Sequence, residues 1–385
     1  MDSEIQTKRD GGMLDGKGPI IFRADRDAAP RVVNRAWLRD ACVCDRCVDP
    51  SSGQKSFSTI DIPEQLPIQD ATVGDDGSLV IQWKNDFLTG ETHTSKYPRR
   101  IWAPRTPWNR DQLETLTPCF HYGDFMAGTT GYRKALWTLQ QYGLIFLHDV
   151  PNSEKTVEEL AAKLGSLQET FYGRTWDVKS KPNAENVAYT NSYLGLHQDL
   201  LYMDNVPRLQ ILHCLQNTCT GGESIFTDSR QIAKLMQQRH PDLYDVLKRY
   251  PLTYHYFKNG HNFARSWAVV QENGEMRWSP PFQLPAQPVD MSSAGEASYA
   301  QWLEAVRKLK PFLEDEQNLY EVKMQSGECV IFDNRRILHG RRQFDVNSGS
   351  RWLKGTYVDH DAYLEKALSI DPFVLRQGWH QSNSN

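Results

Sequence analysis

The side chains with the clearest chemical meaning are two histidines and an aspartate, His197, Asp199 and His339. Residues at positions i and i+2 project to the same face of a β-strand, so His197 and Asp199 can present an imidazole and a carboxylate to one centre. Two histidines and one carboxylate form the facial triad of non-haem Fe(II) oxygenases, which leaves coordination positions open for a co-substrate and O₂. His339, which follows a strand-like run at 327–334, completes the predicted iron site.

An arginine strengthens this interpretation. Arg351 follows His339 by twelve residues and falls on the next expected strand. Its guanidinium can hold the far carboxylate of a 2-oxo dicarboxylic acid in a bidentate geometry that lysine cannot match. A lone HxD motif is common and a lone arginine is usually an ordinary surface residue, but the joint order HxD…H…R favours an oxygenase. The alternative from another class is a binding module on an inactive oxygenase fold.

The cysteines form a second candidate metal site. Of the seven cysteines, Cys42, Cys44 and Cys47 are clustered and the other four are scattered. We expect no secretory signal, and an odd cysteine count in such a chain argues against a disulfide framework. Metal ligation by the cluster is the better interpretation.

The composition excludes several classes of protein. The chain has 385 residues, 44 Lys and Arg, 48 Asp and Glu and a formal net charge of −4, with no block of like charge that would mark a nucleic-acid-binding or membrane-surface protein. No apolar run approaches the ~18 residues that span a bilayer, and the polar N-terminus resembles neither a secretory signal nor a transit peptide. We therefore expect a cytoplasmic protein without a nucleic-acid or membrane partner.

The same patterns predict the elements that position these residues. We expect a flexible arm at 1–18, a small β-rich domain at 19–107 that ends in a Pro- and Arg-rich linker, and a large domain at 108–385. Strands are predicted at 78–83, 143–150, 209–215, 328–332 and 352–358, and helices at 156–164, from 228 onward and at 297–309. Capping boxes are expected at Thr156 to Glu159 and at Asp228 to Gln231. The chain lacks a GxGxxG motif after a strand, a P-loop and a GxSxG elbow, which excludes the common dinucleotide, nucleotide and serine-hydrolase sites.

Six longer segments match a known family. They are WLRDACVCDRCVD (37–49), FYGRTWDV (171–178), ENVAYTNSYLGLHQD (185–199), LQILHCLQNTCTGGES (209–224), GECVIFDNRRILHGRRQF (327–344) and SRWLKGTY (350–357). Through them the sequence resembles the γ-butyrobetaine dioxygenase and trimethyllysine dioxygenase group of Fe(II)/2-oxoglutarate oxygenases. The resemblance implies an α+β, mainly β fold, a double-stranded β-helix or jelly roll with flanking helices, preceded by a small zinc-binding domain. It also implies Fe(II), 2-oxoglutarate and O₂ as reactants, ascorbate as a candidate accessory cofactor, a small zwitterionic substrate and a homodimer.

The resemblance gives the cysteine cluster a structural role. In that family three cysteines and one histidine hold a structural zinc. Cys42, Cys44 and Cys47 match the cysteines, and His93 is the only histidine before the linker. A closed Cys₃His tetrahedron leaves no open position for chemistry, so the zinc site is expected to act as scaffolding.

The resemblance also assigns an aromatic cage to Tyr172, Trp176, Tyr189 and Tyr357. A trimethylammonium group cannot donate hydrogen bonds, so aromatic rings must bind it through cation–π attraction. Asn186 occupies a position where the resemblance associates asparagine with γ-butyrobetaine and an acidic residue with trimethyllysine. The expected reaction is therefore hydroxylation of γ-butyrobetaine to L-carnitine.

One segment departs from the family pattern. Where the relatives have a pair of asparagines after a basic residue, this chain has Arg277-Trp278-Ser279-Pro280-Pro281-Phe282. Either the carboxylate end of the substrate is bound differently, or the substrate is another small amino acid or betaine. In the second case the outcome can be hydroxylation, desaturation or cyclisation in secondary metabolism. Both alternatives stay open on the sequence alone.

Overall fold

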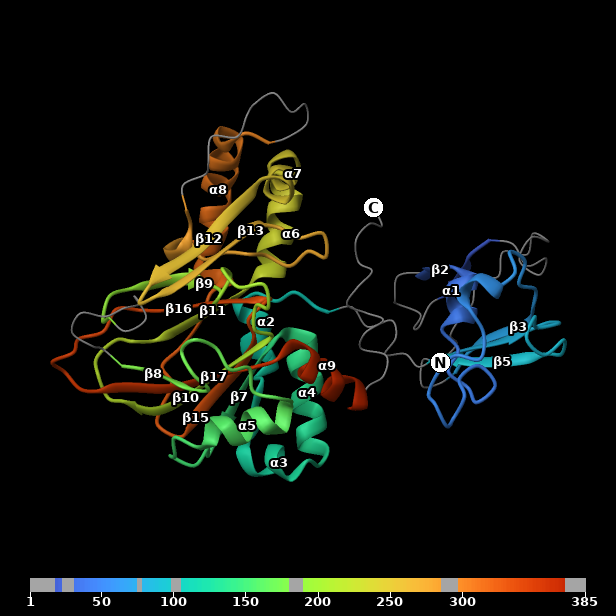
Figure 1. Ribbon diagram of the computed structural model, residues 1–385, viewed down its shortest axis with the longest axis horizontal. Helices are drawn as coiled ribbons and strands as arrows, with labels where there is room; N and C mark the ends of the chain where they lie inside the picture. Colours follow the sequence, from blue (N-terminus) through green and yellow to red (C-terminus); the bar gives the residue numbers. More distant parts are fainter. Residues whose placement is uncertain are drawn as a thin grey trace. The chain divides into compact units, whose positions relative to one another are not determined.

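The chain forms two compact units, Met1–Ala103 and Pro104–Asn385, in a computed structural model (Figure 1). The structure describes residues 18–22, 31–74, 78–97, 105–179, 190–284 and 297–370. The boundary between the units precedes the expected boundary at 107 by four residues. The expected arm, apart from Gly18, and most of the expected linker, at 98–104, lie outside the described residues.

The smaller unit is built from short antiparallel strands and one α-helix. Its elements are β1 (Ile20–Phe22) paired with β2 (Arg31–Val33), α1 (Arg35–Asp40), the 3₁₀ helix η1 (Thr59–Asp61), and a three-stranded sheet of β3 (Ile68–Val73), β4 (Leu79–Trp83) and β5 (His93–Tyr97). Side chains alternate between the two faces of a strand, and β5 accordingly buries His93, Ser95 and Tyr97. This alternation directs His93 into the interior of the unit.

A buried arginine connects parts of the smaller unit. Arg39 is 0 % exposed and donates through Nε and Nη2 to both carboxylate oxygens of Asp86, at 2.5 and 2.8 Å. Its Nη1 donates to Cys47 Sγ at 3.1 Å, and the rings of Phe57 and Phe87 lie 5.3 and 5.0 Å from the guanidinium. Arg39 therefore joins α1 to the turn after β4 and to the cysteine cluster.

Two β-sheets form the frame of the larger unit. The six-stranded sheet has the order β6 (Cys119–His121), β7 (Leu144–His148), β15 (Glu328–Asp333), β10 (Leu209–Asn217), β17 (Arg351–Val358) and β8 (Trp176–Val178). The four-stranded sheet has the order β14 (Tyr320–Val322), β11 (Ser224–Asp228), β16 (Ile337–Arg341) and β9 (Leu194–His197). From β9 to β11 and from β14 to β17, consecutive strands alternate between the two sheets. This connectivity is that of a jelly roll, so the predicted fold is confirmed.

Helices cover the outer faces of both sheets (Figure 1). Their bounds are α2 (Arg110–Leu116), α3 (Tyr122–Ala127), α4 (Thr130–Tyr142), α5 (Thr156–Leu164), α6 (Ser229–Arg239), α7 (Pro241–Arg249), α8 (Tyr299–Glu314) and α9 (His360–Ile370). Helices α3, α4, α5 and α9 lie against the six-stranded sheet, while α6, α7 and α8 lie with a separate hairpin, β12 (Pro251–Lys258) and β13 (His261–Ala268), against the four-stranded sheet. The described residues of this unit also include two short 3₁₀ helices, η4 (Pro280–Phe282) and η5 (Glu316–Asn318).

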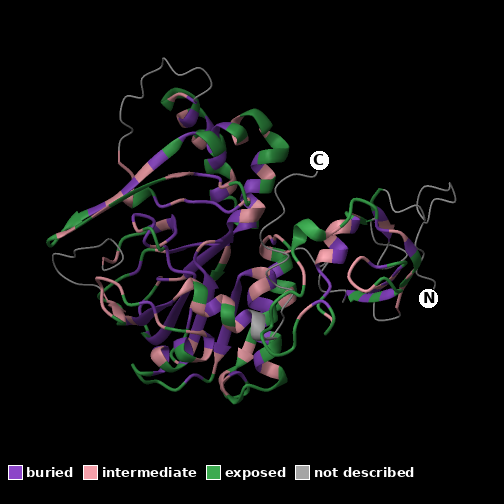
Figure 2. Ribbon diagram, turned by 45° about the vertical axis from the view of Figure 1, so that its right-hand side comes forward, coloured by how far each residue is buried: buried purple, intermediate pink, exposed green. Residues whose placement is uncertain are grey.

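The core of the larger unit has three layers. Apolar side chains pack between α4, α5 and the six-stranded sheet, between the two sheets, and between the four-stranded sheet and α6 to α8. Figure 2 shows the result: the sheet strands are largely buried, whereas the helices present exposed residues to solvent. The two sheets are thus held rigidly on both faces, which suits them to carry a site between them.

Three details of the predicted elements are wrong. No capping box forms at Thr156, because its hydroxyl donates to the Pro151 carbonyl at 3.1 Å and Lys155 is the N-cap. Asp228 caps α6 by accepting from the Arg230 amide, at 3.0 Å, without a box to Gln231. Helix α8 continues through Pro311 to Glu314, beyond its expected end at 309.

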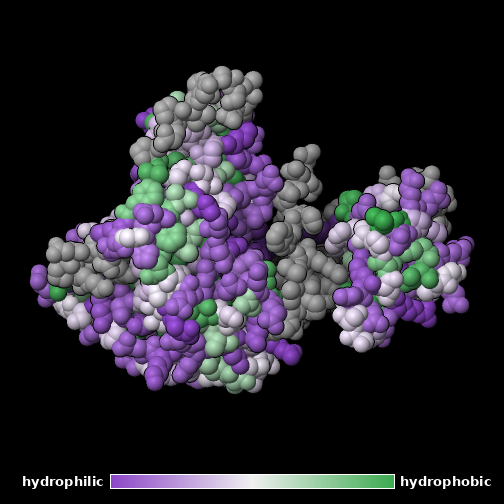
Figure 3. Space-filling view, viewed as in Figure 1, coloured by the Kyte–Doolittle hydropathy of each residue, from purple (hydrophilic) through white to green (hydrophobic). Residues whose placement is uncertain are grey.

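The surface carries only scattered apolar side chains on the face drawn in Figure 3, which is mostly hydrophilic. Isolated exposed apolar residues such as Ile60 and Phe257 are ordinary on folded proteins. Among the residues that the structure describes, no helix combines the length and the apolar character needed to cross a membrane.

A second buried arginine fastens three parts of the larger unit. Arg336, between β15 and β16, donates to both carboxylate oxygens of Asp228 at 3.0 and 2.7 Å. It also donates to the carbonyls of Gln141, in α4, and Thr106, at 2.8 and 2.7 Å. The two charged side chains are 1 and 0 % exposed, so each depends on the other for neutralisation.

Replacing Arg336 by methionine is expected to lower the free energy of unfolding by about 3–5 kcal/mol, because the Asp228 carboxylate is left buried and unpaired. Urea denaturation measures the loss. The matched control is Arg342→Met, which breaks a pair with Glu321 whose side chains are 39 and 40 % exposed and costs no more than about 1 kcal/mol. Equal losses in the two variants would contradict this expectation.

Candidate functional site

The structure brings His197, Asp199 and His339 together on the four-stranded sheet. His197 ends β9 and pairs directly with His339 in the middle of β16, and their ring centroids are 4.3 Å apart. The Asp199 oxygens lie 3.3 Å from His197 Nε2 and 3.9 Å from His339 Nε2. One ligand atom from each residue lies within 4.8 Å of the others, so the predicted triad is assembled.

The way in which Asp199 is placed differs from the prediction. Strand β9 ends at His197, and Leu200 has a left-handed φ of 60°, so Asp199 is not on the strand that carries His197. Asn334 fixes it instead: its Oδ1 accepts from the Asp199 amide at 2.9 Å, and its Nδ2 donates to the Asp199 carbonyl at 3.1 Å. A side-chain amide, not the alternation of a strand, therefore holds the backbone of Asp199 in place.

The residue between the two ligands is also tied down. Gln198 is fully buried, donates to the Asn334 carbonyl at 2.9 Å and accepts from the Trp278 amide at 3.0 Å. Its own amide donates to the Trp278 carbonyl at 2.8 Å. The short loop that carries Asp199 is therefore held by hydrogen bonds on both sides.

The protonation states suit metal binding. His197 Nδ1 donates to the Gly195 carbonyl at 2.9 Å, which leaves its Nε2 lone pair facing the centre. Burial and the neighbouring His197 lower the pKa of His339 to about 3. Burial alone would raise the pKa of Asp199, but interactions with His197, His339 and Tyr357 hold it well below its ordinary value. A neutral imidazole and an ionised carboxylate are the forms that ligate a transition metal, and a donor set of two histidines and one aspartate fits Fe(II).

Arg351 is a buried cation without an anion. It begins β17, is 8 % exposed and donates through Nε to the Gly222 carbonyl at 3.4 Å. The described part of the chain offers it no ion pair, and burial lowers the pKa of Arg351 to about 10. An uncompensated buried guanidinium is costly, and a carboxylate ligand of the kind predicted would neutralise it.

Two of the predicted cage residues form a stacked pair beside the triad. Trp176 on β8 and Tyr357 on β17 have ring centroids 4.1 Å apart at 29°. Trp176 lies opposite Gly355 in the strand pairing, and a Cβ on Gly355 would come within 2.5 Å of the indole. Glycine is therefore required where the indole crosses β17. The Tyr357 hydroxyl donates to Asp199 Oδ2 at 2.7 Å, which links the aromatic pair to the triad.

A larger aromatic group surrounds Tyr172 and was not predicted. The Tyr172 ring lies 4.2 Å from that of Phe171, and its hydroxyl is hydrogen-bonded to that of Tyr202. Phe171 is the centre of the group, with Tyr256 at 4.9 Å and Phe263 at 5.2 Å, both from the β12–β13 hairpin. In the sequence, the only signal for Tyr202 is that it is an aromatic residue shortly after the HxD motif, because it belongs to no periodic pattern.

Two predicted substrate residues, Asn186 and Tyr189, lie outside the described residues. The segment that departs from the family pattern lies next to the aromatic group, because Phe282 contacts Tyr202 at a centroid distance of 5.1 Å. Within it, the Arg277 guanidinium donates to Glu275 at 3.2 Å. His261, at the start of β13, packs on Phe171 at 4.8 Å. A polar imidazole thus stands at the edge of the aromatic group.

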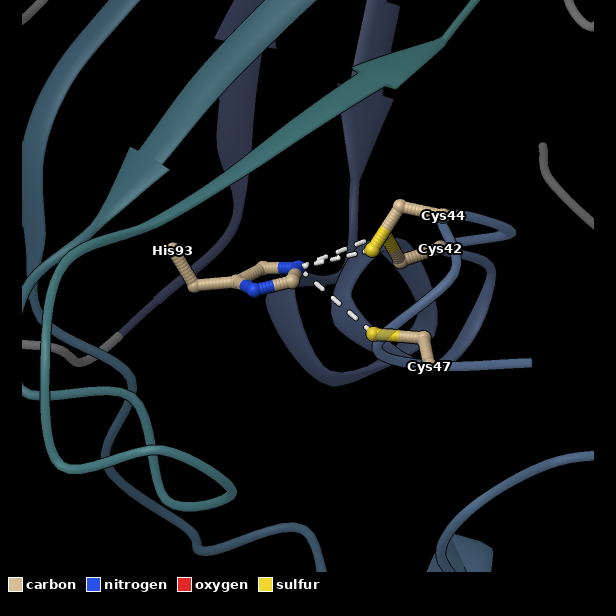
Figure 4. A group of neighbouring side chains, drawn as sticks. All are labelled: Cys42, Cys44, Cys47 and His93. Carbon is tan, nitrogen blue, oxygen red and sulfur yellow. Dashed lines mark hydrogen bonds between the residues drawn. The ribbon is translucent and has the colours of Figure 1, made fainter. Parts of the chain in front are cut away.

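The smaller unit brings Cys42, Cys44, Cys47 and His93 together as predicted (Figure 4). His93 Nε2 points at the three sulfur atoms and lies 3.4, 3.7 and 3.5 Å from them in chain order. A tetrahedral zinc with Zn–S bonds of about 2.3 Å and a Zn–N bond of about 2.0 Å separates sulfur from nitrogen by about 3.5 Å. The four residues therefore have the spacing of a closed Cys₃His zinc site.

Comparisons with known proteins extend over both units. Residues 114–357 match the family described as taurine catabolism dioxygenase TauD, TfdA family. The dioxygenase str8 of Strobilurus tenacellus is 34 % identical, over 87 % of this chain and 84 % of its own. The gamma-butyrobetaine dioxygenase of Pseudomonas sp. strain AK-1 is 32 % identical, over 92 % and 94 % of the two chains. The mitochondrial trimethyllysine dioxygenase of Bos taurus is 28 % identical, over 86 % and 81 %.

Proposed function

Because the chain belongs to the TauD/TfdA family of dioxygenases, we propose that it uses Fe(II), 2-oxoglutarate and O₂ to hydroxylate γ-butyrobetaine to L-carnitine. The observation that carries the choice of substrate class is the stacked pair of Trp176 and Tyr357, one hydrogen bond away from the Asp199 carboxylate. A cation-binding surface thus adjoins the proposed metal. The similarity to a gamma-butyrobetaine dioxygenase over more than nine-tenths of both chains supports the same choice.

His197, Asp199 and His339 would hold the iron, and Arg351 would hold the co-substrate. Bound there, Fe(II) activates O₂ together with a 2-oxo acid, which is the chemistry that oxidation of an unreactive C–H bond requires. Arg351 neutralises the distal carboxylate of 2-oxoglutarate, and its buried position favours a charged partner over water.

The aromatic residues would choose the carbon that reacts. Each favourable ring contributes about 0.5–2 kcal/mol of cation–π attraction to a trimethylammonium group. Because Trp176 and Tyr357 stand on neighbouring strands of a rigid sheet, they fix the cation at a set distance from the triad. The carbon of the substrate that lies at this distance is the one oxidised, which is catalysis by positioning.

A second candidate is the same chemistry on another small amino acid or betaine. The segment from Arg277 to Phe282 favours it, since the Arg277 guanidinium is already bound to Glu275 and two prolines occupy the turn. The similarity to the dioxygenase str8 of Strobilurus tenacellus, at 34 % identity, is compatible with either substrate.

We also propose that the Cys₃His set binds Zn²⁺ as a structural metal. His93, on β5, joins the three-stranded sheet to the cysteine loop, which the metal would hold closed. The hydrogen bond between Cys42 and Cys47 lowers the pKa of the Cys42 thiol and raises that of Cys47, so Cys42 is the member of this pair that more readily supplies the thiolate that zinc requires.

With iron-loaded protein and 2-oxoglutarate, γ-butyrobetaine is expected to stimulate succinate formation, because an occupied aromatic pocket couples co-substrate turnover to substrate. The measurement is a panel of quaternary-ammonium acids and free amino acids scored by succinate and by oxidised product. His339→Ala should abolish turnover with every compound. Stimulation by a different amino acid or betaine, and none by γ-butyrobetaine, would overturn the assigned substrate and support the second candidate.

Gly355→Ala is expected to weaken substrate binding, since its methyl group would displace the Trp176 indole. Loss of one ring contact raises KM for a trimethylammonium substrate by about 2- to 30-fold, the equivalent of about 0.5–2 kcal/mol. Steady-state kinetics measure the change. KM for 2-oxoglutarate serves as the internal control, because Arg351 keeps its surroundings. A parallel rise in both constants would argue against a local effect on the cage.

Purified protein is expected to contain one zinc per chain, and His93→Ala should lose it readily to a chelator, because three thiolates alone do not close the tetrahedron. Metal analysis before and after chelation measures the loss. The control is His121→Ala, which removes a half-exposed histidine from the larger unit. Full retention of zinc by His93→Ala would exclude this residue as a ligand.

A further inference from the structure

We propose that Tyr357 is a positioning residue for the metal ligand Asp199, in addition to being a wall of the aromatic cage. The proposal rests on the iron site of the proposed function but not on the identity of the substrate. It assigns separate tasks to two parts of one side chain. The ring packs against Trp176, and the hydroxyl orients the carboxylate.

The two oxygens of Asp199 have different surroundings. Oδ1 lies 3.3 Å from His197 Nε2. Oδ2 accepts the Tyr357 hydroxyl at 2.7 Å and lies 3.9 Å from His339 Nε2. An ionised carboxylate can only accept hydrogen bonds, so Tyr357 is the donor. It engages Oδ2, on the side of His339, and leaves Oδ1 to face His197.

The hydroxyl is held in place by the sheet that does not carry the ligands. Tyr357 is 3 % exposed and lies on β17 of the six-stranded sheet, where it pairs with Gln210 of β10. Its ring is fixed on one side by Trp176 at 4.1 Å. The hydrogen bond to Asp199 therefore spans from one sheet of the jelly roll to the other, and it fixes the carboxylate torsion that Asn334 cannot reach. Asn334 binds only the backbone of Asp199.

This arrangement predicts that one carboxylate oxygen binds the metal while the other stays with Tyr357. A carboxylate held in this way cannot turn to bind the metal through both oxygens, so a coordination position stays free for the co-substrate or O₂. Groups that orient a metal ligand from behind typically change metal affinity by about 10- to 100-fold when they are removed. A ring that served only as a cage wall would leave metal affinity unchanged.

The test is Tyr357→Phe, which keeps the ring and deletes the hydroxyl. Co(II) titrated into protein that lacks iron but keeps zinc in its Cys₃His set, followed by its visible absorption, reports both affinity and ligand geometry at the triad without any substrate. The dissociation constant is expected to rise by about 10-fold or more, with a changed absorption spectrum. KM for a trimethylammonium substrate should move less, since the stacked ring remains.

The matched control is Tyr202→Phe. It removes another buried tyrosine hydroxyl from the same region, one that bonds to Tyr172 and not to Asp199. General loosening of the aromatic group would weaken Co(II) binding in both variants, whereas the proposal expects the loss only in Tyr357→Phe. Unchanged Co(II) affinity and spectrum in Tyr357→Phe, or equal losses in the two variants, would overturn it. Failure of γ-butyrobetaine as a substrate would leave this result untouched, because the titration contains none.

Discussion

The larger unit depends on keeping one partly buried carboxylate, that of Asp199, charged and correctly turned. Burial disfavours a charge, and among the described residues no lysine or arginine pairs with Asp199. Hydrogen bonds do this work instead, from Tyr357 to the side chain and between Asn334 and the backbone. The carboxylate and the two imidazoles form a donor set whose negative charge a divalent metal would balance. The jelly-roll fold brings the hydrogen-bond donors of Tyr357 and Asn334 close to Asp199.

The smaller unit must also accommodate buried negative charge, and it does so with an arginine. Its thiolates would crowd negative charge into a buried loop, and Arg39 lies against Cys47 with Asp86 behind it. The guanidinium thus serves two acceptors at once, which only its fork of donors allows. In both units a buried charged group is oriented by a second residue that does not touch the metal itself. Removing such a residue would change the metal's surroundings without removing a ligand.

The sequence identified the chemically active residues better than it identified what orients them. The HxD…H order and the cysteine cluster are short motifs. The types and spacing of their ligands limit which metals and which chemistry each can support. Strands β7, β10, β15 and β17 were recognisable because buried strands are apolar runs. The placing of Asp199 by Asn334, and the aromatic group around Phe171, depend on contacts between segments far apart in the chain. At Asp228 a distant residue also intervenes, since Arg336 binds its carboxylate, whereas the hydroxyl of Thr156 is taken by the nearby Pro151 carbonyl.

Strand β17 unites the three parts of the proposed reaction. Side chains alternate along a strand, so Arg351, Gly355 and Tyr357 share one face. The first would offer a cation to the co-substrate, the second makes room for Trp176, and the third joins the aromatic pair to Asp199. A ligand that moves the aromatic pair must therefore strain the hydrogen bond to the metal carboxylate, and the reverse also holds. Since β17 lies between β10 and β8 within the sheet, this coupling acts through a rigid element, and a bound cation and the metal geometry cannot be adjusted independently.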